Sequence, residues 1–159
     1  MKKVISLIMI VICALSIFVG CGSSNEEVES NNSADHSATA DPQKQLKNAN
    51  SNALTVYKSI FDGISDLVEK GEMTKIPTGK FGSIRITDLD TTEYFQNIVK
   101  KNLGEKGLYD EGFITWEIDT NTFKPVFAQW SESTSSPIVG QYPDPETDPN
   151  AQHSIGAKF

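Results

Sequence analysis

Hydrophobic residues recur every three to four positions across residues 42–70, and this period predicts one long amphipathic helix. The apolar positions are Leu46, Ala49, Ala53, Tyr57 or Val56, Ile60, Ile64 or Phe61, Leu67 and Val68. Asp41 and Pro42 provide a start signal, because a side-chain oxygen at the cap is followed by a proline at the first helical position. The helix is expected to end near Gly71.

A second, shorter helix is expected after a turn at residues 76–79 and a short strand over 81–86. Asp90 and Glu93 resemble a capping box with Asp in place of Ser or Thr. Apolar residues then follow helical spacing up to Gly104, at Tyr94, Phe95, Ile98, Val99 and Leu103.

The period changes to two after Gly107, which indicates strands. Residues 114–118 and 126–130 each alternate in this way and flank a polar turn at 119–122, so they predict an antiparallel hairpin. Residues 138–142 are expected to form the last strand, which stops at Pro143. We therefore predict an α+β fold in which the long N-terminal helix packs on a small antiparallel sheet of three to four strands.

The first twenty residues have the pattern of a secretion signal. Lys2 and Lys3 precede a run over 4–20 that is apolar apart from two serines. Phe18-Val19-Gly20-Cys21 resembles the lipobox of bacterial lipoproteins, with Phe18 where that family usually has Leu. The resemblance implies cleavage after residue 20, lipidation of Cys21, and anchoring to the outer face of the bacterial cytoplasmic membrane. An uncleaved transmembrane anchor is the alternative, and it gives the same topology because the lysines stay in the cytoplasm.

The sequence divides into four parts on this interpretation. They are a signal peptide (1–20), a lipidated, disordered acidic stalk (21–41), a folded α+β domain (42–143) and a flexible acidic tail (144–159). The stalk is rich in Ser, Asn, Glu and Ala, so it buries too little apolar surface to offset its chain entropy. Residues 1–20 contain two lysines and no acid, so their removal changes the net charge from −7 to −9. Such an acidic chain lacks the basic footprint that nucleic-acid binding needs.

Two segments of the folded part resemble the globular heads of type IV pilins and pilin-like proteins of Gram-positive bacteria. One runs from Asn48-Ala49-Asn50-Ser51-Asn52-Ala53 into Thr55-Val56-Tyr57. The other is Phe127-Ala128-Gln129-Trp130-Ser131 with Ile138-Val139-Gly140-Gln141-Tyr142-Pro143. Pilins are cut before their apolar helix and polymerise through it, whereas the candidate cut here falls after the apolar run. The resemblance therefore implies a pilin-like head at the cell surface, and not a subunit of a filament core.

The titratable residues do not form a recognisable catalytic motif. The two histidines, His36 and His153, lie outside the predicted folded domain, so the domain cannot hold a His-based triad or dyad. Glu111, Glu117 and Asp119 are candidates for acid–base work, although acids on the polar face of a hairpin are usually solvated. Residues 144–150 place oxygen side chains at every second position, as Ca²⁺ prefers, but the glycine turn and distal Glu of an EF-hand loop are missing. We therefore predict no enzyme, and no catalytic, cofactor-binding or metal-binding residue.

Trp116 and Trp130 lie in matching phase on the two hairpin strands. They are expected to form a core pair under the long helix, with an exposed aromatic platform for sugar or peptide as the alternative. The sequence thus predicts a surface-displayed lipoprotein that acts as a binding or structural module. Its expected partners are the membrane, through the lipid, and a pilus, secretion system or other extracellular protein. The alternatives are a small envelope enzyme or inhibitor using acidic residues, and a calcium-dependent adhesin.

Overall fold

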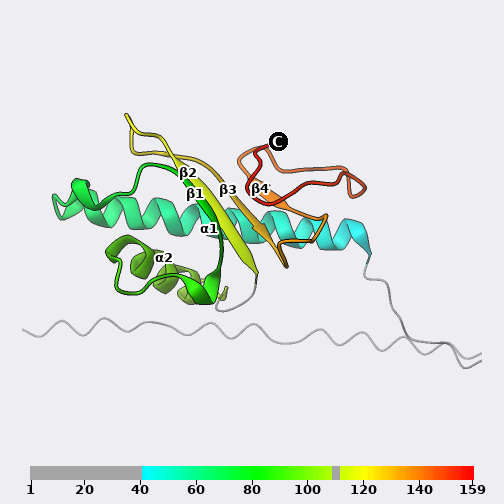
Figure 1. Cartoon of the computed structure of the whole chain (residues 1–159), viewed down its shortest axis with the longest axis horizontal. Helices are drawn as coiled ribbons and strands as arrows, with labels where there is room; N and C mark the ends of the chain where they lie inside the picture. The colour runs from blue at the N-terminus through cyan, green and yellow to red at the C-terminus, as the bar shows by residue number, and fades with distance from the viewer. Residues whose placement is uncertain (1–40, 109–111) are drawn as a thin grey trace, which may run out of the picture. The chain divides into compact units, whose positions relative to one another are not determined.

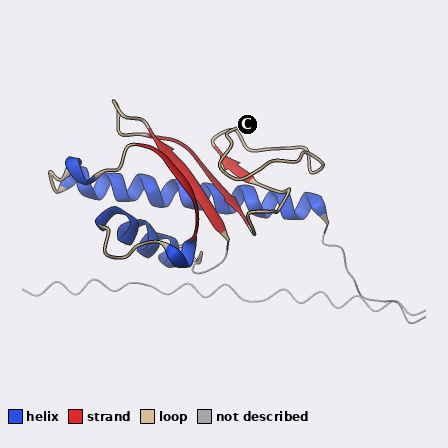
Figure 2. Cartoon of the chain, viewed as in Figure 1, coloured by secondary structure: helices blue, strands red, loops and turns tan. Residues whose placement is uncertain are grey.

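The computed structural model describes residues 41–108 and 112–159, and these residues form an α+β fold (Figures 1 and 2). In chain order the elements are α1 (Pro42–Glu69), a 3₁₀ turn (Met73–Lys75), β1 (Gly79–Arg85), a 3₁₀ turn (Ile86–Asp88), α2 (Tyr94–Glu105), β2 (Phe113–Ile118), β3 (Pro125–Ser131) and β4 (Gly140–Tyr142). The four strands form one antiparallel sheet in the order β1-β2-β3-β4. The prediction of a long helix with a small antiparallel sheet is therefore confirmed.

Helix α1 begins where the sequence predicts. The side chain of Asp41 accepts a hydrogen bond from the backbone N–H of Gln43 at 3.0 Å, and Pro42 occupies the first turn. The buried stripe of the helix faces the sheet and includes Val56 and Ile64, while Phe61 is 52% exposed. At the two positions where the helical period allowed either of two residues, Val56 and Ile64 therefore belong to the buried stripe.

Helix α2 begins differently from the prediction. Its cap is Glu93, whose carboxylate accepts hydrogen bonds from the backbone N–H groups of Phe95 at 3.2 Å and Gln96 at 2.7 Å. Asp90 instead accepts from the backbone and hydroxyl of Thr92, in the turn before the helix. The predicted capping box at Asp90 and Glu93 is therefore wrong, because the helix starts three residues later and Glu93 caps it directly.

The core lies between α1, α2 and the inner face of the sheet. Trp116 is 1% exposed, and its ring stacks on Phe81 of β1 with 4.0 Å between centroids. Phe95 of α2 approaches the same indole at 6.4 Å. Trp130 lies on the same face, because it pairs with Ile114, yet it is only partly buried at the edge of the core. The prediction of a core pair therefore holds fully for Trp116 and in part for Trp130.

Strand β4 approaches the backbone of α1 very closely. A Cβ atom added to Gly140 would lie 2.0 Å from the carbonyl carbon and oxygen of Ala49 and 2.4 Å from the backbone nitrogen of Asn50. Only glycine allows this approach. Beside it, the backbone N–H of Gln141 donates to Oδ1 of Asn50 at 3.2 Å.

The C-terminal segment differs from the expected loose tail. Residues 143–159 contain no helix or strand (Figure 2), but they lie against β4 and the outer face of the sheet (Figure 1). His153 donates its backbone N–H to the carbonyl of Pro137, and the ammonium of Lys80 donates to the carbonyl of Gly156. Polar contacts to backbone groups fix this segment, and an apolar period cannot reveal them.

The predicted signal peptide, Cys21, and nearly all of the stalk lie outside the described residues, as does Glu111. No helix within 41–108 or 112–159 is long and apolar enough to cross a membrane.

Candidate functional site

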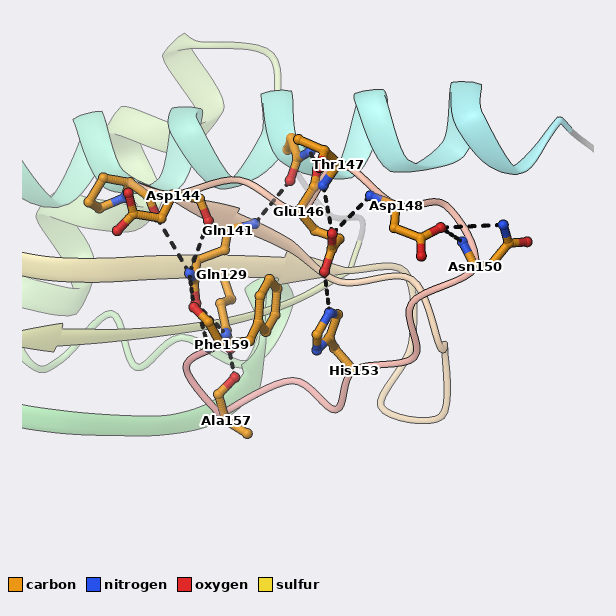
Figure 3. Close-up of polar contacts among 12 residues, drawn as sticks. Gln129, Gln141, Asp144, Glu146, Thr147, Asp148, Asn150, His153, Ala157 and Phe159 are labelled. Carbon is orange, nitrogen blue, oxygen red and sulfur yellow. Dashed lines mark hydrogen bonds and ion pairs between the residues drawn. The ribbon is translucent and has the colours of Figure 1, made fainter.

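Two glutamines hold the C-terminal segment against the outer face of the sheet (Figure 3). Gln129 of β3 and Gln141 of β4 are cross-strand neighbours and are both 0% exposed. Nε2 of Gln129 donates to Oε1 of Gln141 at 3.0 Å. A buried amide is costly unless both its donors and its acceptor are paired, so these two side chains need further partners.

The C-terminal backbone supplies those partners. Gln129 donates to the carbonyl of Ala157 at 2.7 Å and accepts from the N–H of Gly156 at 2.8 Å. Gln141 donates to the carbonyl of Phe159 at 2.9 Å and accepts from the N–H of the same residue at 3.4 Å. The two amides therefore form hydrogen bonds with both carbonyl and N–H groups of the segment's main chain.

A second cluster fixes the loop that precedes this contact. Oε1 of Glu146 accepts from the backbone N–H groups of Thr147 at 2.7 Å and Asp148 at 2.8 Å, while Oε2 lies 2.5 Å from Nε2 of His153 (Figure 3). The His153 ring stacks on Phe159 with 3.6 Å between centroids. The hydrogen bond from Asp148, followed by those from His153 and Thr147, lowers the pKa of Glu146 from 4.5 to about 2.

Two of the three carboxylates in the acidic run at residues 144–150 accept hydrogen bonds from the same run. Glu146 is engaged as described, and Asp148 accepts from the backbone N–H of Asn150 at 2.9 Å. Within the described ranges, no three His, Cys, Asp or Glu side chains are grouped so that they could hold a metal ion. Oxygens of Glu146 and Asp148 that suggested a calcium ligand set thus accept from backbone donors.

The described candidates for acid–base chemistry are Asp119 and Glu117, at the end of β2 and within it. Asp119 closes the β2–β3 hairpin turn by accepting from Asn121 and Thr122, and the backbone N–H of Thr122 is the main cause of its lowered pKa. Glu117 lies within β2 in register with Lys80 of β1. Asp119 thus uses its carboxylate within the turn.

Two adjoining surface hollows lie at the N-terminal end of α1. The first has a volume of about 130 Å³ and lies between α1, Trp130 and the loop that follows β3. The second has a volume of about 650 Å³ and reaches the C-terminal segment at residues 149–152. Gln45 and Ile138 line both hollows, so the two share part of their walls. A third hollow of about 260 Å³ lies beside Tyr57 and Tyr142.

Sequence reasoning missed the polar residues that organise this region. Gln129 and Gln141 were noted only within the pilin-like segments, and Asn50 was noted in the same way. Asn50 joins α1 to β4 and also donates Nδ2 to the carbonyl of Glu146 at 2.8 Å. An amide at an alternating strand position is a usable signal only when its partner is known, and here the partners lie up to 96 residues away.

Comparisons of this chain with models of known protein families, with curated protein sequences and with solved structures found no match.

Proposed function

We propose that this protein is a lipoprotein, anchored through Cys21 to the outer face of the bacterial cytoplasmic membrane, whose folded domain is a pilin-head-like binding or structural module. The observation that carries the proposal is the sequence Phe18-Val19-Gly20-Cys21, which follows an apolar run and precedes a folded unit that starts at Asp41. A two-chain lipid on one thiol is sufficient for stable membrane anchoring, since each buried CH₂ contributes about 0.8 kcal/mol.

The residues between Cys21 and α1 have the length and composition of a spacer. About twenty residues in the coil regime span roughly 25 Å on average. Their acidic side chains have no basic neighbours in the sequence, so charge repulsion favours extension. The domain would then stand clear of the headgroups, where a partner can reach it.

Contacts between the two pilin-like segments support the proposed kind of domain. Ala49 packs on Gly140, Asn50 accepts from the N–H of Gln141, and the rings of Tyr57 and Tyr142 meet edge to face at 4.9 Å. The residues that carry the resemblance thus form one helix–strand contact. Asp119, one of the carboxylates considered for chemistry, closes a hairpin turn, and Glu146 and Asp148 of the acidic run accept from backbone N–H groups, which supports binding over catalysis. A pilus, a secretion system or another extracellular protein is the proposed kind of partner.

Replacement of each cysteine in turn tests the anchor. The Cys21→Ser full-length protein should leave the membrane fraction and lose labelling by a radioactive fatty acid, because the thiol is the attachment point. The matched control is Cys13→Ser, which removes the other cysteine and should leave both labelling and membrane retention unchanged. Membrane retention of unlabelled Cys21→Ser protein would contradict the proposal.

A further inference from the structure

We propose that the two adjoining hollows at the N-terminal end of α1, which together form one candidate site, bind a neutral carbohydrate. This inference rests on the proposed role of the domain as a binding module and names the chemical class of one ligand. The larger part of the hollow, at about 650 Å³, falls within the range of about 300–1,000 Å³ that is usual for ligand pockets. The smaller part adds a recess beside Trp130.

The polar lining of the hollow is mostly neutral amides. Gln45, Asn48 and Gln152 are exposed, and their side chains make no hydrogen bond to any other described residue. An amide offers one acceptor and two donors on adjacent atoms. Neighbouring sugar hydroxyls also donate and accept, so a pair of them fits an amide in either orientation.

The apolar lining includes an aromatic ring that is held in place. Ile138 and the half-buried Trp130 line the recess. The pyrrole edge of the indole lies against the backbone of Gly112, because a Cβ atom there would be 2.4 Å from Nε1 of Trp130. An aromatic surface that is already ordered loses little conformational entropy on binding. It can cover the C–H face of a pyranose while the amides engage its hydroxyls.

The charge of the lining selects against ionic ligands. Glu132 is the one charged residue among those that line either part of the hollow, and no Lys or Arg lines them. A phosphate-bearing ligand would be repelled by this carboxylate and by the net negative charge of the chain, and it would find no Lys or Arg in the lining to pair with. A calcium ion needs about six to eight oxygen ligands, and a single carboxylate supplies too few. A proline-rich peptide needs a groove lined by aromatic residues, and one indole does not provide it.

Saturation-transfer NMR on the full chain in detergent micelles tests the inference directly. The probes are chitotriose, maltotriose and cellotriose, with glucose 6-phosphate and a proline decamer as comparisons. At least one neutral trisaccharide should receive saturation, and the two comparison probes should receive none. The dissociation constant should rise about three- to tenfold in Asn48→Ala, which is the range expected when one hydrogen bond is lost.

The matched control is Asn97→Ala, an exposed asparagine of α2 that lines neither part of the hollow. Its affinity for the same trisaccharide should stay within twofold of wild type. Equal weakening by both substitutions would overturn the inference, as would absence of saturation transfer to all three sugars at millimolar concentration. Binding of the proline decamer in place of the sugars would also overturn it. None of these outcomes bears on retention through Cys21, which the membrane assay measures separately.

Discussion

Replacement of Gly140 by Ala tests the helix–strand contact on which the fold depends. In the structure, the added methyl would lie 2.0 Å from two backbone atoms of Ala49 and 2.4 Å from one of Asn50. These atoms belong to the backbone of a helix and cannot rotate away as a side chain can. β4 must therefore move off α1, which also strains the 3.2 Å hydrogen bond from Gln141 to Asn50.

The expected loss follows from these two effects. Overpacking of a tight contact costs about 1–3 kcal/mol, and the rigid neighbours place this case at the upper end. Weakening the hydrogen bond adds about 1 kcal/mol. The free energy of unfolding should therefore fall by about 3–4 kcal/mol, which lowers the melting temperature by about 10 °C or more in a domain of this size.

Urea unfolding followed by circular dichroism measures this difference, with Gly82→Ala as the matched control. Gly82 is exposed on β1, and a Cβ atom there would meet nothing within 4 Å. The control should change the free energy of unfolding by less than about 0.5 kcal/mol. If Gly140→Ala also stays within 1 kcal/mol of wild type, β4 does not rest on the backbone of α1 and the reasoning is refuted.

Four further substitutions test the core and the C-terminal segment. Trp116→Ala should lower the free energy of unfolding by about 3–5 kcal/mol and Trp130→Ala by clearly less, because only the first ring is fully buried; equal losses in urea unfolding would contradict this difference. Glu146 has a folded-state pKa of about 2 against an ordinary 4.5, so its stabilisation is complete above pH 4.5 and is lost as the pH falls toward 2. Stability measured across this window should show that loss in wild type but not in Glu146→Gln, and parallel curves would refute the assignment. Gln141→Leu removes the amide that holds Phe159, so amide exchange of the last residues should speed up, and unchanged exchange would show that other contacts hold them.

The parts of the fold that depend on periodic burial could be predicted from the sequence. The stripe on α1 and the alternation on β2 and β3 each place apolar residues on one face, and burial of those faces fixes the layers. The start of α1 was also readable, since the cap and the proline are local signals. Pattern alone could not decide between Tyr57 and Val56, because both fall within the width of the apolar stripe.

The parts that depend on specific polar partners could not be predicted. Glu93 caps α2 with its own side chain, and the sequence equally allowed Asp90 as the cap. The C-terminal segment has few large apolar residues, so composition favoured a loose tail. Its order comes from main-chain hydrogen bonds to Gln129 and Gln141, which no local pattern encodes. The candidate hollow is missed for the same reason, because its walls come from three separate stretches of the chain.

Intact mass spectrometry of the protein isolated from membranes tests the central claim most directly. The account predicts a polypeptide that begins at Cys21 and carries a diacylglyceryl group on its sulfur. A polypeptide that retains residues 1–20 with an unmodified sulfur at Cys21 would contradict it.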